Sequence, residues 1–143
     1  MKVAGRFASD PNGGPTGKPE LQIEAIDRYG GTYAFWCRID TGADYELMLP
    51  DVLCGYLPLV NQIVDGAIVK DFEGKPSICD TFELEITWFG SRRFISGVKV
   101  QSGNPLVGYT LFSHGATFSH GPTNAPVRLQ IDWISGLVSV DDQ

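Results

Sequence analysis

The sequence predicts a single, mostly β domain with a closed or barrel-like sheet and one or two short helices. Its 143 residues are an ordinary length for one domain, and no internal boundary or repeat of domain size is visible. The 17 glycines and 9 prolines are spread along the chain, and long stretches of helical periodicity are missing. Many short runs of strand character follow one another closely, which is typical of closed sheets.

The first half of the chain contains three predicted strands and one helical segment. Residues 21–26 alternate apolar and polar side chains, and residues 32–39 are aromatic and rich in β-formers. A short strand over 45–50 ends at a proline, and residues 51–59 have room for one or two helical turns.

The second half begins with a long hairpin and continues in short elements. The hairpin covers residues 62–82, and we expect its tip at 71–74, where Gly74 supplies the positive φ of a tight turn. The remaining predicted elements are a further strand after the hairpin and before residue 90, a strand at 92–101, a short helix at 109–115 and two strands within 127–140 around Ser135–Gly136. We expect residues 1–19 to be flexible and residues 116–126 to form a loop, because both are rich in loop-forming residue types.

Charge and composition exclude several function classes. The net charge is −6 and no basic run is longer than Arg92–Arg93, which argues against a nucleic acid partner. No apolar run is long enough to span a bilayer, and the N-terminus lacks the apolar core of a signal peptide, so we expect a cytoplasmic protein without a membrane partner. The three cysteines form no CxxC pair and are expected to be buried thiols rather than metal ligands. The three tryptophans are expected in the core, since aromatic residues on strands usually pack there.

One segment, "CRIDTGADYELMLP" (37–50), carries a carboxylate at the end of an apolar strand. We expect Asp40 to be buried, and a buried carboxylate costs several kcal/mol unless it is hydrogen-bonded or paired. Gly42 lets the backbone approach the carboxylate, and Thr41 adds a hydroxyl to a local network. A surface turn is the plain alternative, because Asp, Thr and Gly are all common in turns.

This segment resembles the active-site segment of the retropepsin-like aspartic proteases. A second signature of that family, two apolar residues and a glycine before a short helix, is matched by "PLVG" (105–108) followed by "YTLFSHG". The hairpin lies between the two signatures, as in the family, and the resemblance extends from about Leu21 to Val140. It implies a single retropepsin-like acid-protease barrel over residues 1–143 and an aspartic endopeptidase.

The resemblance also implies catalytic roles. Asp40 is the expected catalytic carboxylate, Thr41 bonds its twin across a two-fold axis, and the Gly42 N–H bonds the carboxylate. Hydrolysis by carboxylates needs two of them, one to accept a proton and one to donate it, and the chain holds one Asp-Thr-Gly. A homodimer therefore supplies the second copy of Asp40. The terminal strand over 137–140 is a candidate for pairing across the dimer, as in the retroviral relatives.

The expected substrate is an extended peptide or protein segment, closed over by a flap at residues 69–76. The expected substrate-binding residues are Ala43, Asp44, Val69, Phe72, Gly74 and Val107. An apolar groove is expected to be lined by Leu47, Val69, Phe72, Ile78 and Val107. The resemblance also implies that Leu106, Val107 and Gly108 pack beneath the active-site loop. For Asp44 an ion pair with Arg38 or Arg92 is an equal alternative. No metal or organic cofactor is expected, because two carboxylates and water suffice.

The chain departs from the family at Glu46, where many members have Thr or Ser, and at its more acidic flap tip "DFEG". Its segment 113–126 is longer than a minimal member needs. A second hypothesis is a catalytically silent peptide- or protein-binding module on the same fold, because fold does not determine function.

Overall fold

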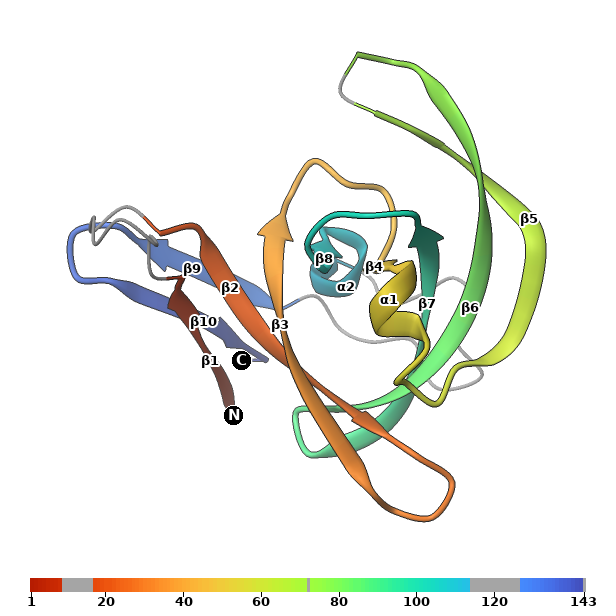
Figure 1. Cartoon of the computed structure of the whole chain (residues 1–143). Helices are drawn as coiled ribbons and strands as arrows, with labels where there is room; N and C mark the ends of the chain where they lie inside the picture. The colour runs from red at the N-terminus through yellow and green to blue at the C-terminus, as the bar shows by residue number, and fades with distance from the viewer. Residues whose placement is uncertain (9–16, 72, 114–126, 143) are drawn as a thin grey trace.

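The molecule is a mostly β domain with two short helices in its described part, and 62% of the described residues lie in strands (Figure 1). The structure is a computed structural model, and it describes residues 1–8, 17–71, 73–113 and 127–142. Its elements are β1 (Lys2–Phe7), β2 (Pro19–Ile26), β3 (Thr32–Asp40), β4 (Leu47–Pro50), α1 (Asp51–Cys54), β5 (Val60–Lys70), β6 (Pro76–Trp88), β7 (Ser91–Val100), β8 (Leu106–Gly108), α2 (Thr110–Ser113), β9 (Arg128–Asp132) and β10 (Leu137–Asp141). Neither helix has the length and apolar composition needed to cross a membrane.

Six of the strands close into a barrel. The order around it is β6-β7-β4-β8-β3-β2, and pairing of β2 with β6 closes the ring. Two of the contacts are parallel, β3 with β8 and β4 with β7, and the others are antiparallel. The predicted closed, mostly β fold with short helices is therefore confirmed.

The barrel interior is filled by alternate residues of its strands. In β2 the side chains of Leu21, Ile23 and Ala25 are buried, while Gln22 and Glu24 between them are exposed. The period of two places successive side chains on opposite faces of a strand, so one face supplies the core. The same alternation in β6 buries Phe82, Leu84, Ile86 and Trp88.

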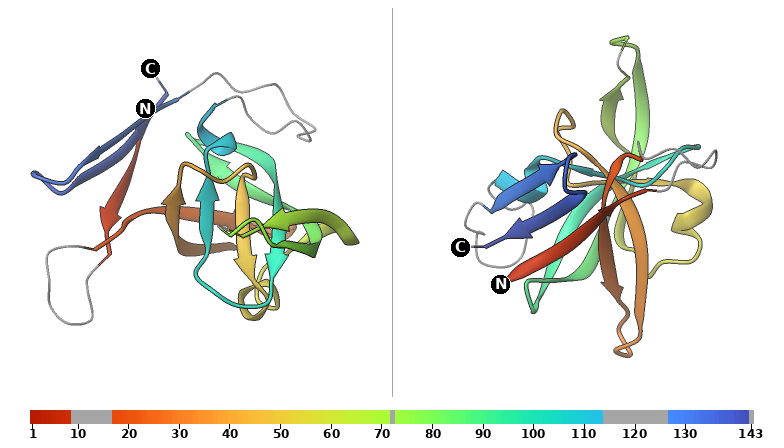
Figure 2. Two further views of the ribbon diagram at one scale, coloured as in Figure 1. Left: turned by 90° about the horizontal axis from the view of Figure 1, so that it is seen from above. Right: turned by 90° about the vertical axis from the view of Figure 1, so that its left-hand side faces the viewer.

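A second, three-stranded sheet stands to one side of the barrel (Figure 2). Its order is β1-β10-β9, and β1 belongs to both sheets: Lys2–Ala4 pair with β10, whereas Gly5–Phe7 pair with β2. We expected residues 1–19 to be flexible, but the structure places residues 2–7 in a strand. This strand is defined by its pairing with β2 and with β10, and β10 lies at the other end of the sequence.

The predicted long hairpin is present as β5 and β6. Its turn spans residues 71–75, and Gly74 has the predicted positive φ, +81°. The further strand expected after the hairpin is not separate, because β6 continues unbroken for 13 residues into the barrel wall. Phe72 lies outside the described residues.

Several local predictions can be compared with the structure. All three cysteines are free and buried, as predicted, and burial raises the pKa of their thiols. Trp88 is in the core, but Trp133 is 67% exposed, so its expected burial was wrong. Trp133 lies just beyond the end of β9, where its indole contacts the ring of Phe7 at the end of β1, with 5.6 Å between the ring centroids, and is otherwise open to solvent.

Candidate active site

The Asp40 loop, residues 40–46, connects β3 to β4 at one end of the barrel (Figure 1). Asp40 is the last residue of β3 and is opposite Gly108 in the parallel pairing with β8. The two sequence signatures, Asp-Thr-Gly and the apolar pair with glycine, are thus adjacent strand ends in space.

Asp40 has its carboxylate at the surface of the single chain. The Gly42 N–H donates a hydrogen bond of 3.1 Å to Asp40 Oδ1, as the resemblance implied. Our expectation that Asp40 is buried was wrong, because β3 runs out of the barrel at this end and no described element covers it. The bond from Gly42 fixes one carboxylate oxygen and leaves the side chain accessible.

The Asp40 loop is held from beneath by backbone hydrogen bonds to β8 and the residue after it. Gly108 N–H donates to the carbonyl oxygen of Glu46 at 3.0 Å, and Tyr109 N–H donates to that of Ala43 at 3.2 Å. A Cβ on Gly108 would overlap the carbonyl oxygen of Tyr45. A glycine at this position therefore allows β8 to approach the loop backbone closely.

Two further polar residues of the loop lie at the surface. Thr41 and Asp44 are both exposed. Asp44 forms no ion pair within 4.0 Å among the described residues, and Arg92, one of its two suggested partners, pairs with Glu85 instead. Tyr45 lies near both carboxylates: burial, and then the charges of Asp40 and Asp44, raise the pKa of its phenol to about 12. The loop thus presents two carboxylates and a neutral phenol.

Glu46 is a buried member of the loop whose role sequence reasoning missed. Its carboxylate is 4% exposed, accepts the Ser96 N–H at 3.0 Å and forms an ion pair of 3.3 Å with Arg93. Burial raises the pKa of the Glu46 carboxyl to about 7, although the Ser96 N–H and Arg93 both lower it. The signal was a single charged residue beside the apolar run "LMLP", noted above only as a departure from the family pattern.

The predicted substrate contacts fall into two groups. Val107 and Leu47 are fully buried in the barrel core, so their predicted contacts with a substrate are wrong. Both side chains belong to the core cluster of the barrel, and Val107 directly precedes Gly108, whose N–H bonds the Asp40 loop. The side chain of Ala43 is also buried, and its carbonyl oxygen is bonded to Tyr109.

The hairpin carries the remaining predicted contacts. Val69, half-buried, pairs with Ser77 near the tip, and Ile78 and Gly74 are exposed. In Figures 1 and 2 the hairpin tip extends beyond the barrel at the same end as the Asp40 loop. A long hairpin and the carboxylate therefore share one end of the molecule.

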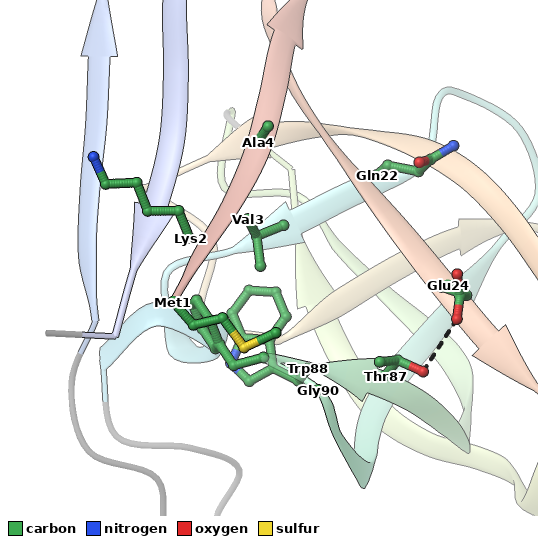
Figure 3. Close-up of a pocket in the computed structure, with 10 residues that line it drawn as sticks. Met1, Lys2, Val3, Ala4, Gln22, Glu24, Thr87, Trp88 and Gly90 are labelled. Atoms are coloured by element: carbon green, nitrogen blue, oxygen red, sulfur yellow. Dashed lines mark hydrogen bonds between the residues drawn. The ribbon is translucent and has the colours of Figure 1, made fainter.

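A shallow hollow of about 320 Å³ lies elsewhere, between β1 and the barrel (Figure 3). Met1 and Trp88 lie together at one end of it, and Gln22 and Glu24 line the other. None of its lining residues belongs to the Asp40 loop or to the hairpin tip. This hollow therefore takes no part in the candidate active site.

The described residues contain no group of three or more His, Cys, Asp or Glu side chains that could hold a metal ion. Both histidines lie outside the described part of the chain.

Comparison with known proteins adds no relative. No family model matches the chain, and neither a search of curated proteins nor a search of solved structures gives a significant match.

Proposed function

We propose that the protein is a retropepsin-like aspartic endopeptidase whose catalytic dyad is formed by Asp40 from each of two copies. The observation that carries the proposal is the exposed Asp40 carboxylate, oriented by the Gly42 N–H in a loop that β8 supports. An ion pair or a metal site would give this carboxylate a structural purpose, and the described residues offer it neither.

The chemistry requires two carboxylates that hold one proton between them. Two carboxylates about 3 Å apart do not both ionise at neutral pH, so one is protonated and the other is charged. The charged carboxylate takes a proton from water, whose oxygen attacks the peptide carbonyl carbon. The protonated carboxyl gives its proton to the carbonyl oxygen, and the intermediate then collapses with a proton on the departing nitrogen.

The hairpin of β5 and β6 supplies the substrate side of the proposal. It is long, extends past the end of the barrel and has exposed edges near its tip. An extended peptide between the hairpin and the Asp40 loop can form main-chain hydrogen bonds with such an edge. Asp44 and Val69 are the residues that we propose to contact it.

The test is peptide cleavage by the wild type and by Asp40→Asn over pH 4 to 9. Asn keeps the shape of the side chain and an oxygen for the Gly42 N–H, but it cannot hold or accept the shared proton. We expect cleavage by the wild type that falls at alkaline pH, as the shared proton is lost, and a loss of at least about 1,000-fold in Asp40→Asn. Cleavage that survives the substitution, or that keeps rising up to pH 9, would rule out the proposal.

If neither protein cleaves any peptide, the remaining hypothesis is a catalytically silent binding module. A measurement of peptide binding by the wild type then tests that hypothesis. Tyr109→Phe is a matched control for Asp40→Asn. The Tyr109 side chain is exposed beside the Asp40 loop, and the bond that Tyr109 gives to Ala43 comes from its backbone N–H, which the substitution keeps.

A further inference from the structure

We propose that the outer edge of β9 pairs with β9 of a second copy of this chain, antiparallel about a two-fold axis at Gln130. The inference rests on the proposed function in one respect, since it names the contact through which the dimer required there would form.

The β9 edge is open in the described part of the chain. In the order β1-β10-β9, β9 is the terminal strand, and each of its five residues is paired with β10 on the other side. An unpaired edge presents a row of N–H and C=O groups that readily pair with another strand. Ser139 and Val140 are paired on both sides, with β1 and with β9, so half of the terminal strand over 137–140 predicted for the dimer contact is occupied within its own chain.

The sequence of β9, Arg-Leu-Gln-Ile-Asp, is complementary to itself when reversed. In antiparallel pairing about Gln130, Arg128 lies opposite Asp132 of the second copy, and Leu129 lies opposite Ile131. Directly opposite residues in an antiparallel pair share a face, with Cβ atoms about 5 Å apart. Each dimer therefore has two opposite-charge pairs on one face and two apolar pairs on the other.

The side chains of β9 already have the exposure that this pairing requires. Arg128 and Gln130 are exposed, whereas Leu129 and Ile131 on the other face are half-buried. Hydrogen bonds from Ser135 and Ile134 lower the pKa of the Asp132 carboxyl, so it carries its negative charge at neutral pH. The charges needed for the two cross-pairs are present at the edge.

The turn between β9 and β10 adds apolar surface beside the β9 edge. Trp133 is 67% exposed and Ile134 is fully exposed, and Leu137 at the start of β10 is half-exposed. Exposed aromatic and aliphatic side chains that gather at one place mark protein contact sites. In the same register Trp133 lies beside Val127 of the second copy, which would cover part of the indole.

The start of β9 is also linked to the Asp40 loop. Val127 N–H donates to the carbonyl oxygen of Phe112 in α2, and Tyr109, just before α2, donates to Ala43. A dimer contact at β9 is thus connected through α2 to the loop that must meet its twin.

The experiment uses charge changes on the proposed axis. Gln130→Glu and Gln130→Lys each place two like charges opposite each other in a homodimer, whereas a mixture of the two variants places opposite charges there. We expect each variant alone to weaken the dimer by at least about fivefold, and the mixture to form a heterodimer of about wild-type affinity. Sedimentation at several concentrations measures each dissociation constant. Gln22→Glu and Gln22→Lys are matched controls, because Gln22 is exposed on β2, a strand with neighbours on both sides.

A second variant tests the charge pairs away from the axis. Arg128→Glu sets a carboxylate opposite Asp132 at two places, and we expect it to weaken the dimer more than the axis variants do. A monomeric wild type, or a dimer insensitive to both positions, would overturn the β9 contact. In the second case the peptidase can still act through a dimer joined elsewhere. A dimer that behaves as expected but cleaves no peptide leaves the β9 contact in place and refutes the proposed function.

Discussion

Gly108 is the residue on which the geometry of the Asp40 loop depends most directly. Its N–H bonds the loop, and the lack of a side chain lets β8 lie against the carbonyl groups of Tyr45 and Ala43. Gly42, although part of the Asp-Thr-Gly signature, has no such constraint in the single chain: a Cβ there would lie 3.5 Å from Asp40 Oδ1, an ordinary contact.

Gly108→Ala should therefore destabilise the protein far more than Gly42→Ala. The added methyl group meets backbone, which cannot rotate away, so we expect a loss of about 3 kcal/mol in the free energy of unfolding. Gly42→Ala should cost less than about 1 kcal/mol. Urea denaturation of both variants measures the difference, and equal losses would show that the loop can move away from β8.

Burial of the Glu46 carboxyl, only partly offset by the Ser96 N–H and Arg93, gives the stability a pH dependence of defined sign. The pKa of Glu46 rises from its ordinary value of 4.5 to about 7 in the folded protein, where the folded state holds the proton more tightly than the unfolded state. The contribution of Glu46 to stability is thus complete below about pH 4.5 and is lost as the pH rises through 7. The pKa difference corresponds to roughly 3 kcal/mol.

Glu46→Gln removes this titration and keeps an oxygen for the Ser96 N–H. We expect the unfolding free energy of the wild type, relative to Glu46→Gln, to fall by up to about 3 kcal/mol between pH 4.5 and 7. Denaturation at several pH values measures it. The control is Glu85→Gln, which breaks the more exposed pair with Arg92 and should change stability by less than about 1 kcal/mol at every pH. Parallel curves for the wild type and Glu46→Gln would mean that folding does not raise the pKa of Glu46.

At the scale of the element, the turn of the β5–β6 hairpin depends on one side chain. Asp71 Oδ1 accepts the N–H groups of Glu73 and Lys75, both at 2.9 Å. These bonds fix the tip that we propose to contact the substrate, whereas the exposed arms contribute little to the core.

Asp71→Ala should loosen the tip without unfolding the barrel. Each lost bond is worth roughly 1 kcal/mol, so amide hydrogen exchange at Glu73 and Lys75 should quicken by about 5- to 30-fold. Global stability should change by less than about 1 kcal/mol. Asp71→Asn keeps the accepting oxygen and serves as the control; equally fast exchange in both variants would contradict the role of that oxygen.

The elements that local pattern predicts best are those with a clear period or a turn residue. The strand at 21–26, the hairpin turn with Gly74 and the turn at Ser135–Gly136 all follow from residues close in sequence. β1 was missed because its hydrogen bonds are made with β2 and β10. The local sequence of residues 2–7 does not indicate a pairing partner at the far end of the chain.

The candidate site was predictable to the same extent. The bond from Gly42 to Asp40 and the contact of Asp40 with the second signature were expected from the family resemblance of the two motifs, whereas the exposure of Asp40 was not. The burial of Val107 and the pairing of Glu46 with Arg93 do not, because they depend on which strands become neighbours in the closed barrel.

At the scale of the whole molecule, the proposed dyad makes activity a property of pairs of chains. If each dimer needs two Asp40 carboxylates, a mixed dimer with one Asp40→Asn chain is inactive. Equal amounts of wild-type and variant chains, allowed to exchange, should then show about half the activity per wild-type chain that the wild type shows alone. Peptide cleavage across a series of mixing ratios measures this. Activity per wild-type chain that stays constant would mean that a single chain is sufficient.

β1 belongs to both sheets, so it joins the three-stranded sheet directly to the barrel. Its partners change between Ala4 and Gly5, and a Cβ on Gly5 would meet the carbonyl group of Glu20 on one side and the side chain of Val138 on the other. Because Gly5 has no side chain, the three-stranded sheet β1-β10-β9 can pack closely against the barrel. A larger residue at position 5 would push the three-stranded sheet away from the barrel and widen the angle between them. Since β9 lies on one sheet and Asp40 on the other, that angle would decide whether the two Asp40 loops of the proposed dimer can face each other.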